Sequence, residues 1–165
     1  MSNKFEILMH QLDMPLEMRN SEAFLNAEIE KVLVHKVSRV WEFHFSFTNI
    51  LPIEIFRELQ KRLAQEFSKT GNQAIFEIHC QDPQVSDELL QAYYQLAFEE
   101  GPCASHGFKS LYQDLQVHLD GDKLLIEGAS TIDTEHFRKN HLPNLSRQLV
   151  KYGFPHLTCQ VQHSD

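Results

Sequence analysis

Histidine is the residue type with the widest chemistry in this sequence, because it serves both as a general base and as a metal ligand. The chain has ten histidines among its 165 residues, and they are scattered along it. Cys103 and His106 have the spacing of a ligand pair, but a structural zinc site needs four ligands and no second close pair lies nearby. His136 and His141 are five residues apart, which places them on different sides of a helix. We therefore expect no metal site and no cofactor.

Nucleophiles and paired carboxylates lack the surroundings that catalysis requires. No serine lies in a Gly-x-Ser-x-Gly turn, and the six glycines are isolated, so no glycine-rich loop could bind a phosphate. Paired carboxylates such as Asp120 and Asp122 fall at an expected turn, a solvated position that does not suit a general acid or base. Cys80, Cys103 and Cys159 are odd in number and far apart, which favours reduced thiols. We expect no catalytic residue and no small-molecule substrate.

Two groups of basic residues are the remaining candidates for a functional surface. They lie on two expected helices and comprise Arg57, Lys61, Arg62, Arg138, Lys139, Arg147 and Lys151. Such residues ordinarily form a solvated helix face with ion pairs, and Glu58 precedes Arg62 by the four residues that such a pair requires. Alternatively, they dock onto an acidic protein surface or a nucleic-acid backbone. The formal net charge of -8 repels phosphates at long range and favours the protein partner.

Hydrophobic periodicity predicts a unit of hairpin, helix and strand in the first half of the chain. The predicted elements are a helix at 3–13, a short helix after Ser21, strands at 29–37 and 41–47, a helix from Pro52 to Gly71 and a strand at 74–80. The second strand alternates polar residues with an aromatic row, which consists of Trp41, Phe43, Phe45 and Phe47. We expect this row in the core, and an exposed platform that stacks single-stranded bases is the alternative.

The second half of the chain repeats this order of elements. The predicted elements are a helix from Ser86 or Asp87 to Gly101, a short helix at 105–112, strands at 115–119 and 122–127, a helix at 132–152 divided near Pro143, and a strand at 157–162. Asp120 and Gly121 form the expected two-residue turn, which pairs Val117 with Leu124 and Leu115 with Ile126.

These patterns predict an α+β fold of two small domains, at residues 1–81 and 82–165. Each domain contains a β-hairpin, a helix and a strand, with additional N-terminal and connecting helices. No apolar run approaches the roughly 20 residues that span a bilayer. The N-terminal residues Met1–Phe5 lack the apolar stretch of a signal peptide. A cytoplasmic protein is therefore expected.

The stretch Ser-Arg-Val-Trp41-Glu-Phe-His-Phe-Ser-Phe, with the helix from Pro52 to Phe67, resembles the N-terminal region of PolC-type DNA polymerase III from streptococcal-like Gram-positive bacteria. The resemblance covers the whole chain and implies the first and second N-terminal domains of that family. It also implies a much longer parent protein with DNA-directed DNA polymerase and 3′–5′ exonuclease activities. The family's first domain is similar to type II KH folds and to the polymerase-binding domain of the clamp-loader tau subunit.

The resemblance implies a non-catalytic protein-interaction module that tethers the polymerase to other replisome proteins during DNA replication. The candidate partners are the clamp-loader tau subunit and helicase-loading components. Binding of single-stranded nucleic acid is the alternative function. However, nucleic-acid-binding KH domains use a Gly-x-x-Gly loop, and this sequence contains none.

Overall fold

The structure, a computed structural model, describes residues 3–100, 116–128 and 131–163. Packing divides the chain into two compact units. The first unit comprises residues 1–84 with 151–153, and the second comprises residues 85–150 with 154–165. The helix predicted at 105–112 lies outside the described residues. No helix within the described ranges is both long and apolar enough to cross a membrane.

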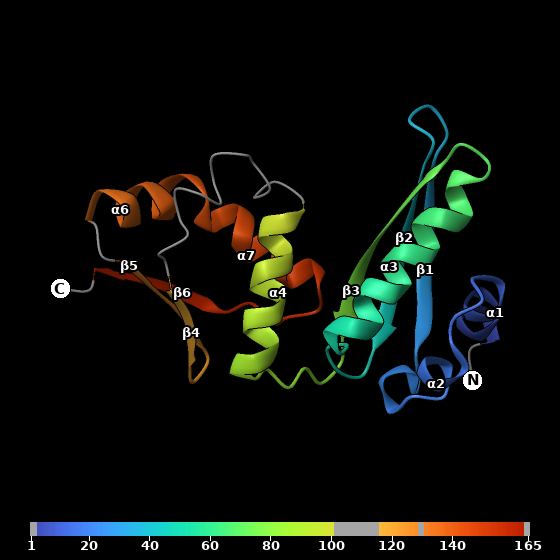
Figure 1. Cartoon of the computed structure of the whole chain (residues 1–165), viewed down its shortest axis with the longest axis horizontal. Helices are drawn as coiled ribbons and strands as arrows, with labels where there is room; N and C mark the ends of the chain where they lie inside the picture. The colour runs from blue at the N-terminus through green and yellow to red at the C-terminus, as the bar shows by residue number, and fades with distance from the viewer. Residues whose placement is uncertain (1–2, 101–115, 129–130, 164–165) are drawn as a thin grey trace. The chain divides into compact units, whose positions relative to one another are not determined.

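The first unit is built on a three-stranded sheet in the order β1-β2-β3 (Figure 1). Its strands are β1 (Glu28–His35), β2 (Val40–Phe47) and β3 (Gln73–Cys80). β1 and β2 form an antiparallel hairpin, while β2 and β3 run parallel and are joined by helix α3 (Ile53–Ser68). A parallel pair requires such a crossover, because a tight turn cannot connect the ends of two parallel strands. The predicted hairpin, helix and strand are confirmed.

Short helical segments precede this sheet, namely α1 (Asn3–Gln11), α2 (Leu16–Arg19) and the 3₁₀ turn η1 (Glu22–Phe24). α1 contacts β1, and its apolar residues Phe5, Leu8 and Met9 are buried. The type II KH-like identity of this unit stays a prediction, since the strand order alone does not identify that fold.

The aromatic row of β2 lies in the core, as predicted. Its fully buried members are Phe43, Phe45 and Phe47. Phe5 of α1 packs edge-on against Phe45 and Phe47, with ring centroids 5.6 and 5.5 Å away. Trp41 is partly buried, and the ring of Phe67 from α3 lies 5.2 Å from it. Because α1 and α3 cover this face, it does not offer an open platform for stacking bases.

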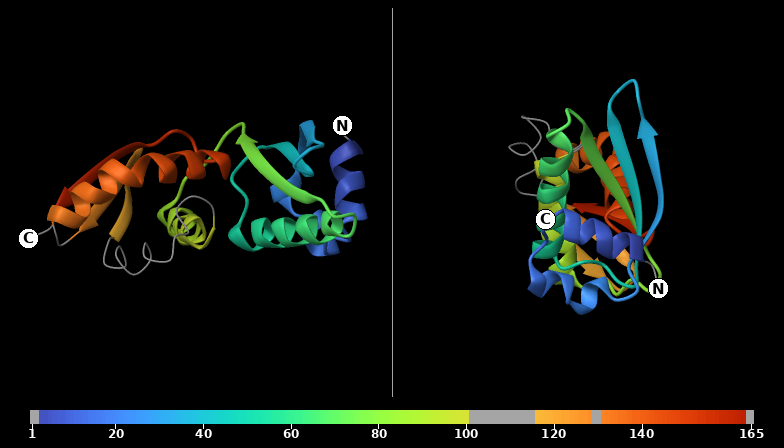
Figure 2. Two further views of the ribbon diagram at one scale, coloured as in Figure 1. Left: turned by 90° about the horizontal axis from the view of Figure 1, so that it is seen from above. Right: turned by 90° about the vertical axis from the view of Figure 1, so that its right-hand side faces the viewer.

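The second unit repeats the first in topology. Its sheet has the order β4-β5-β6, with strands β4 (Gln116–Asp120), β5 (Lys123–Gly128) and β6 (Thr158–His163). β4 and β5 are antiparallel, and β5 and β6 are parallel. Helices α6 (Thr131–Asn140) and α7 (Leu142–Lys151) connect β5 to β6 and run along one face of the sheet (Figure 2). The predicted division near Pro143 is confirmed, and helix α4 (Asp87–Glu99) precedes the sheet.

The turn of the second hairpin differs from the prediction. The observed pairs are Asp120–Lys123, Leu119–Leu124 and Val117–Ile126. The predicted pair Val117–Leu124 is therefore wrong, and Ile126, predicted to pair with Leu115, pairs with Val117 instead, while Leu115 lies outside the described residues. The central turn residues are Gly121 and Asp122. Gly121 has a φ of +63°, and positive φ at the first central position is the glycine signature of a type II′ turn, whereas the predicted Asp-Gly turn needs positive φ at both positions. The register moves by two residues, so the same side chains still face the core.

Candidate functional site

The face of the first sheet opposite α3 gathers ionisable side chains from all three strands. Strand pairing places Lys31, His44 and Glu77 side by side, and in the next row Leu33, Glu42 and Ile75. Successive side chains on a strand point to opposite faces, so these rows lie on the side away from the aromatic core. We call this surface the open face, and it comprises Glu30, Lys31, Leu33, His35, Glu42, His44, Ser46, Ile75, Glu77 and His79.

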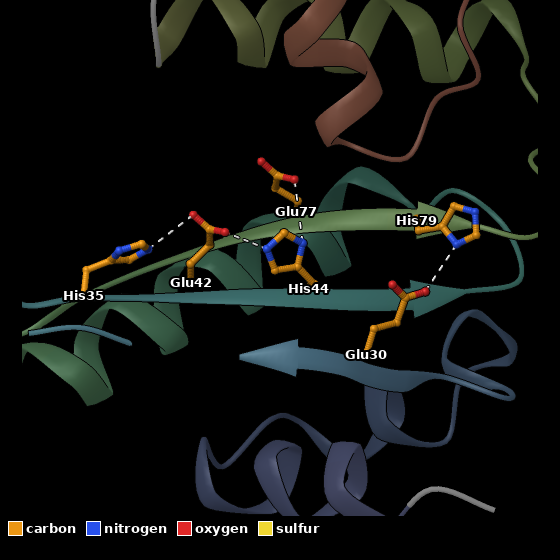
Figure 3. Close-up of polar contacts among 6 residues, drawn as sticks. All are labelled: Glu30, His35, Glu42, His44, Glu77 and His79. Atoms are coloured by element: carbon orange, nitrogen blue, oxygen red, sulfur yellow. Dashed lines mark hydrogen bonds and ion pairs between the residues drawn. The ribbon is translucent and has the colours of Figure 1, made fainter. Parts of the chain in front are cut away.

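Glu42 is the centre of the polar contacts on the open face (Figure 3). His44 donates from Nε2 to Glu42 Oε2 at 2.6 Å, and His35 Nε2 lies 3.7 Å from Glu42 Oε1. The other ring nitrogen of His44, Nδ1, lies 3.8 Å from Glu77 Oε2. These contacts link β1, β2 and β3 in one chain of alternating histidine and carboxylate groups.

A second pair lies at the other end of the same face. His79 Nδ1 of β3 is 3.3 Å from Glu30 Oε1 of β1. Glu30 can reach across because it lies at an irregularity in the β1–β2 pairing, between Ile29 and Lys31. Such a β-bulge re-aims side chains at a sheet edge.

The hydrogen bond from His44 lowers the pKa of Glu42 below its ordinary value of 4.5. Burial acts in the opposite direction, while the charges of His44 and His35 lower the pKa further. Glu42 is therefore an ionised carboxylate at neutral pH, which suits recognition better than proton transfer. Within the described ranges, no group of three or more His, Cys, Asp or Glu side chains could hold a metal ion.

The two described cysteines are not set up as nucleophiles. Burial raises the pKa of Cys80 to about 11. Burial also raises the pKa of Cys159, although the hydrogen bond of this thiol with Ser146 acts in the opposite direction. The Cys159 thiol lies 3.2 Å from Ser146 Oγ, beside a small apolar cavity of the second unit. At neutral pH both thiols are protonated, and a protonated thiol is a poor nucleophile.

The basic residues singled out from the sequence lie on helices, apart from the open face. Arg62 of α3 forms the predicted ion pair with Glu58 and also donates to the carbonyl oxygens of Leu12 and Asp13. These contacts tie the segment after α1 to α3. Arg57 and Lys61 are exposed on the same helix, on the other side of the first sheet from the open face.

The corresponding residues of the second unit lie on α6 and α7. Arg138 pairs with Glu135, and Arg147 donates to the side-chain oxygen of Asn144. Lys139 and Lys151 are exposed. The basic surface therefore stays a prediction.

Sequence reasoning missed the open face as a surface. The alternation of Glu42, His44 and Ser46 with the aromatic row was the available signal. It could not show which residues of β1 and β3 lie beside them, because pairing between strands is not local in sequence.

Comparison with known proteins identifies close relatives of both halves of the chain. A family model for "DNA polymerase III polC-type N-terminus I" matches residues 4–78, and one for "DNA polymerase III polC-type N-terminus II" matches residues 92–165. The protein named DNA polymerase III PolC-type of Streptococcus sanguinis (strain SK36) is 95% identical over all 165 residues. The proteins of that name from Streptococcus pneumoniae (strain D39) and Streptococcus pyogenes (serotype M5) are 64% and 50% identical, over 100% and 98% of the chain. The chain spans 11% of the length of each of these relatives, and no solved structure matches it significantly.

Proposed function

The chain belongs to the PolC-type DNA polymerase III family, as its first and second N-terminal domains, and on this basis we propose that it is a protein-interaction module of a replicative polymerase. In this role it tethers the polymerase to other replisome proteins during DNA replication in the cytoplasm. The polymerase and 3′–5′ exonuclease activities belong, in this proposal, to parts of the longer protein outside this non-catalytic segment.

The open face is the observation that best supports docking of a protein. Leu33 and Ile75 lie on either side of Glu42, and they are 40% and 47% exposed. Carboxylates outnumber the single lysine on this face, so its charge is negative while the histidines are neutral. A basic segment with aliphatic side chains would find both apolar contacts and charge complementarity there.

We propose that this basic segment belongs to a replisome protein. The clamp-loader tau subunit is the first candidate, and helicase-loading components are the second. Both candidates rest on the family role of the chain in replication. The basic residues on α3, α6 and α7 form a competing surface, which would require an acidic partner instead.

A binding experiment with the 165-residue chain tests this proposal. The chain is immobilised, and purified tau subunit or helicase-loading protein is titrated over it. Ile75→Lys adds a positive charge to the open face, which would repel a basic segment, whereas Ile7→Lys adds the same charge to an exposed aliphatic position of α1 and serves as the control. We expect Ile75→Lys to weaken binding at least about tenfold and Ile7→Lys to leave it unchanged.

Two results would contradict this assignment. Failure of every candidate to bind the unmodified chain would remove the tethering role. Loss of binding in Lys139→Glu with Lys151→Glu, but not in Ile75→Lys, would move the docking surface to the basic helices.

Binding of single-stranded nucleic acid has weaker support. The exposed Lys139 and Lys151 favour it, but the aromatic row is covered and the open face is acidic. Phosphate contacts make such binding steeply dependent on salt. A flat titration with a single-stranded oligonucleotide at low salt would exclude this function.

A further inference from the structure

β1 forms an outer edge of the first sheet, and within the described residues no strand lies on the side of β1 away from β2 (Figure 1). Every residue of β1 except Ile29 is exposed. Three consecutive aliphatic residues, Val32, Leu33 and Val34, are 37%, 40% and 45% exposed, and Val37 just beyond the strand is fully exposed. An edge strand of this kind presents unpaired backbone N–H and C=O groups together with apolar side chains.

The corresponding edge in the second unit is protected. β4 occupies the same place in its sheet as β1 does in the first. There, the backbone N–H of Leu119 donates to Asp87 Oδ1 at 3.0 Å, and Gln91 Nε2 donates to the carbonyl oxygen of Val117. Helix α4 thus satisfies outward-facing backbone groups of β4 with two of its own side chains.

The edge of β1 has no such protection. Helix α1 contacts β1, yet residues 30–37 stay exposed. The hydrogen bond that Glu30 of β1 forms with His79 joins two side chains and leaves the backbone edge of the strand uncovered. Unpaired edges are normally covered or blocked by charge, because they otherwise pair with another chain. The edge of β4 is protected and the equivalent edge of β1 is not, so the edge of β1 is suited to accept a strand.

The charge along this edge indicates the chemistry of the incoming strand. Glu28 and Glu30 lie at the start of β1, where Glu30 contacts His79. The other end of the edge is basic, since Lys31 of β1 and Lys36 and Arg39 of the following turn lie in the segment 31–41, which contains no acidic residue. This basic segment stands out in a chain with a net charge of -8. An acidic segment would be attracted to it, whereas a basic one would be repelled.

We propose that the outer edge of β1 accepts an extended, acidic segment of a partner protein as a fourth strand of the first sheet. Backbone hydrogen bonds supply the pairing, and alternate side chains supply the specificity. Val32 and Val34 pair with Phe43 and Trp41 and so lie on the α3 side of the sheet, where they meet every second residue of the incoming strand. The edge shares Lys31, Leu33 and His35 with the open face, but strand pairing uses the outward backbone groups of β1 and not Ile75, so this inference does not depend on the proposed function.

Nucleic acid is the competing occupant of a basic edge. It would use the cations but could not pair with the backbone groups or use the three aliphatic side chains. The combination of an unpaired strand edge with exposed aliphatic residues favours a polypeptide.

Synthetic peptides of about nine residues, a usual strand length, can probe this edge on the 165-residue chain. One labelled peptide alternates valine with glutamate, and the other alternates valine with lysine. We expect the glutamate peptide to bind, and the lysine peptide to bind at least tenfold more weakly by fluorescence anisotropy. Val34→Ser, which removes an apolar contact without adding a charge, should reduce binding of the glutamate peptide at least tenfold. Lys31→Glu with Lys36→Glu should reverse the preference between the peptides.

Matched controls separate this edge from general effects of charge. Ile7→Ser removes an exposed aliphatic side chain from α1, and Lys61→Glu reverses an exposed charge on α3. Both should leave peptide binding unchanged. Far-UV circular dichroism verifies that each variant is folded.

Several results would overturn the proposal. These are no binding of either peptide, equal binding of both, or full binding retained in Val34→Ser. A single-stranded oligonucleotide that competes with the peptide and binds Val34→Ser as tightly as the unmodified chain would assign the edge to nucleic acid. If Val34→Ser abolishes peptide binding but leaves binding of the tau subunit intact, the edge and the open face are distinct sites.

Discussion

The pair of Glu42 and His44 shows how single residues set the character of the open face. The two residues are two positions apart on β2, so both point to the same side of the sheet. Their hydrogen bond keeps Glu42 ionised, and the second nitrogen of His44 lies near Glu77 of β3. The result is a fixed carboxylate between two exposed aliphatic residues.

We predict that His44→Phe raises the pKa of Glu42 towards its ordinary value of 4.5, because the hydrogen bond from His44 is the largest cause of the lowering. A carboxyl whose pKa is lowered in the folded state adds stability above its unfolded pKa and loses this contribution as pH falls through the folded value. In this variant, Glu42 should therefore contribute less to the decrease in the free energy of unfolding of the first unit as the pH falls below 4.5. NMR titration of the Glu42 carboxyl carbon measures the shift directly.

His79→Phe is the control for this titration, because His79 contacts Glu30 and not Glu42. It should leave the pKa of Glu42 unchanged. An unchanged pKa in His44→Phe would mean that the contact does not persist in solution.

At the scale of elements, the second hairpin depends on one glycine. Gly121 occupies the first central position of the turn with positive φ, and a Cβ atom built there would meet nothing within 4 Å. The cost of replacing it is therefore conformational and not steric. The turn aligns β4 with β5, and β5 is the central strand of the second sheet.

Gly121→Ala should destabilise the second unit by about 1–2 kcal/mol, the cost of left-handed backbone for a residue with Cβ. Gly121→Asn should cost less, because asparagine tolerates positive φ better than alanine does. Urea unfolding followed by far-UV circular dichroism measures both values. Equal stability of Gly121→Ala and the unmodified chain would mean that the turn takes another conformation.

At the scale of the whole molecule, the chain consists of two units with the same topology and separate cores. Leu59 of α3 is fully buried in the first core, and Leu145 of α7 is fully buried in the second. Each sheet is covered on one face by the helices of its own crossover. Two such cores should respond separately to substitutions.

Leu59→Ala and Leu145→Ala should each cost about 2–5 kcal/mol in the unit that contains the residue, through lost burial and a cavity. Trp41 reports on the first unit alone. We expect Leu59→Ala to lower the midpoint of the fluorescence transition, while Leu145→Ala should leave it unchanged and shift only the circular dichroism signal. A fluorescence midpoint that moves in both variants would indicate one cooperative unit.

The sequence by itself determined the order and type of the described elements apart from α2, the burial of the aromatic row and the repetition of hairpin, helix and strand. These features follow from local signals, such as the alternation along β2 and the apolar stripe of α3, which depend on neighbours a few residues away. Only the tertiary structure decided the register of the second hairpin, because the same apolar faces are compatible with two turns. It also decided which side chains meet on the open face and which strand edge is left uncovered. Contacts such as that of His44 with Glu77 join residues far apart in sequence, and no local pattern specifies them.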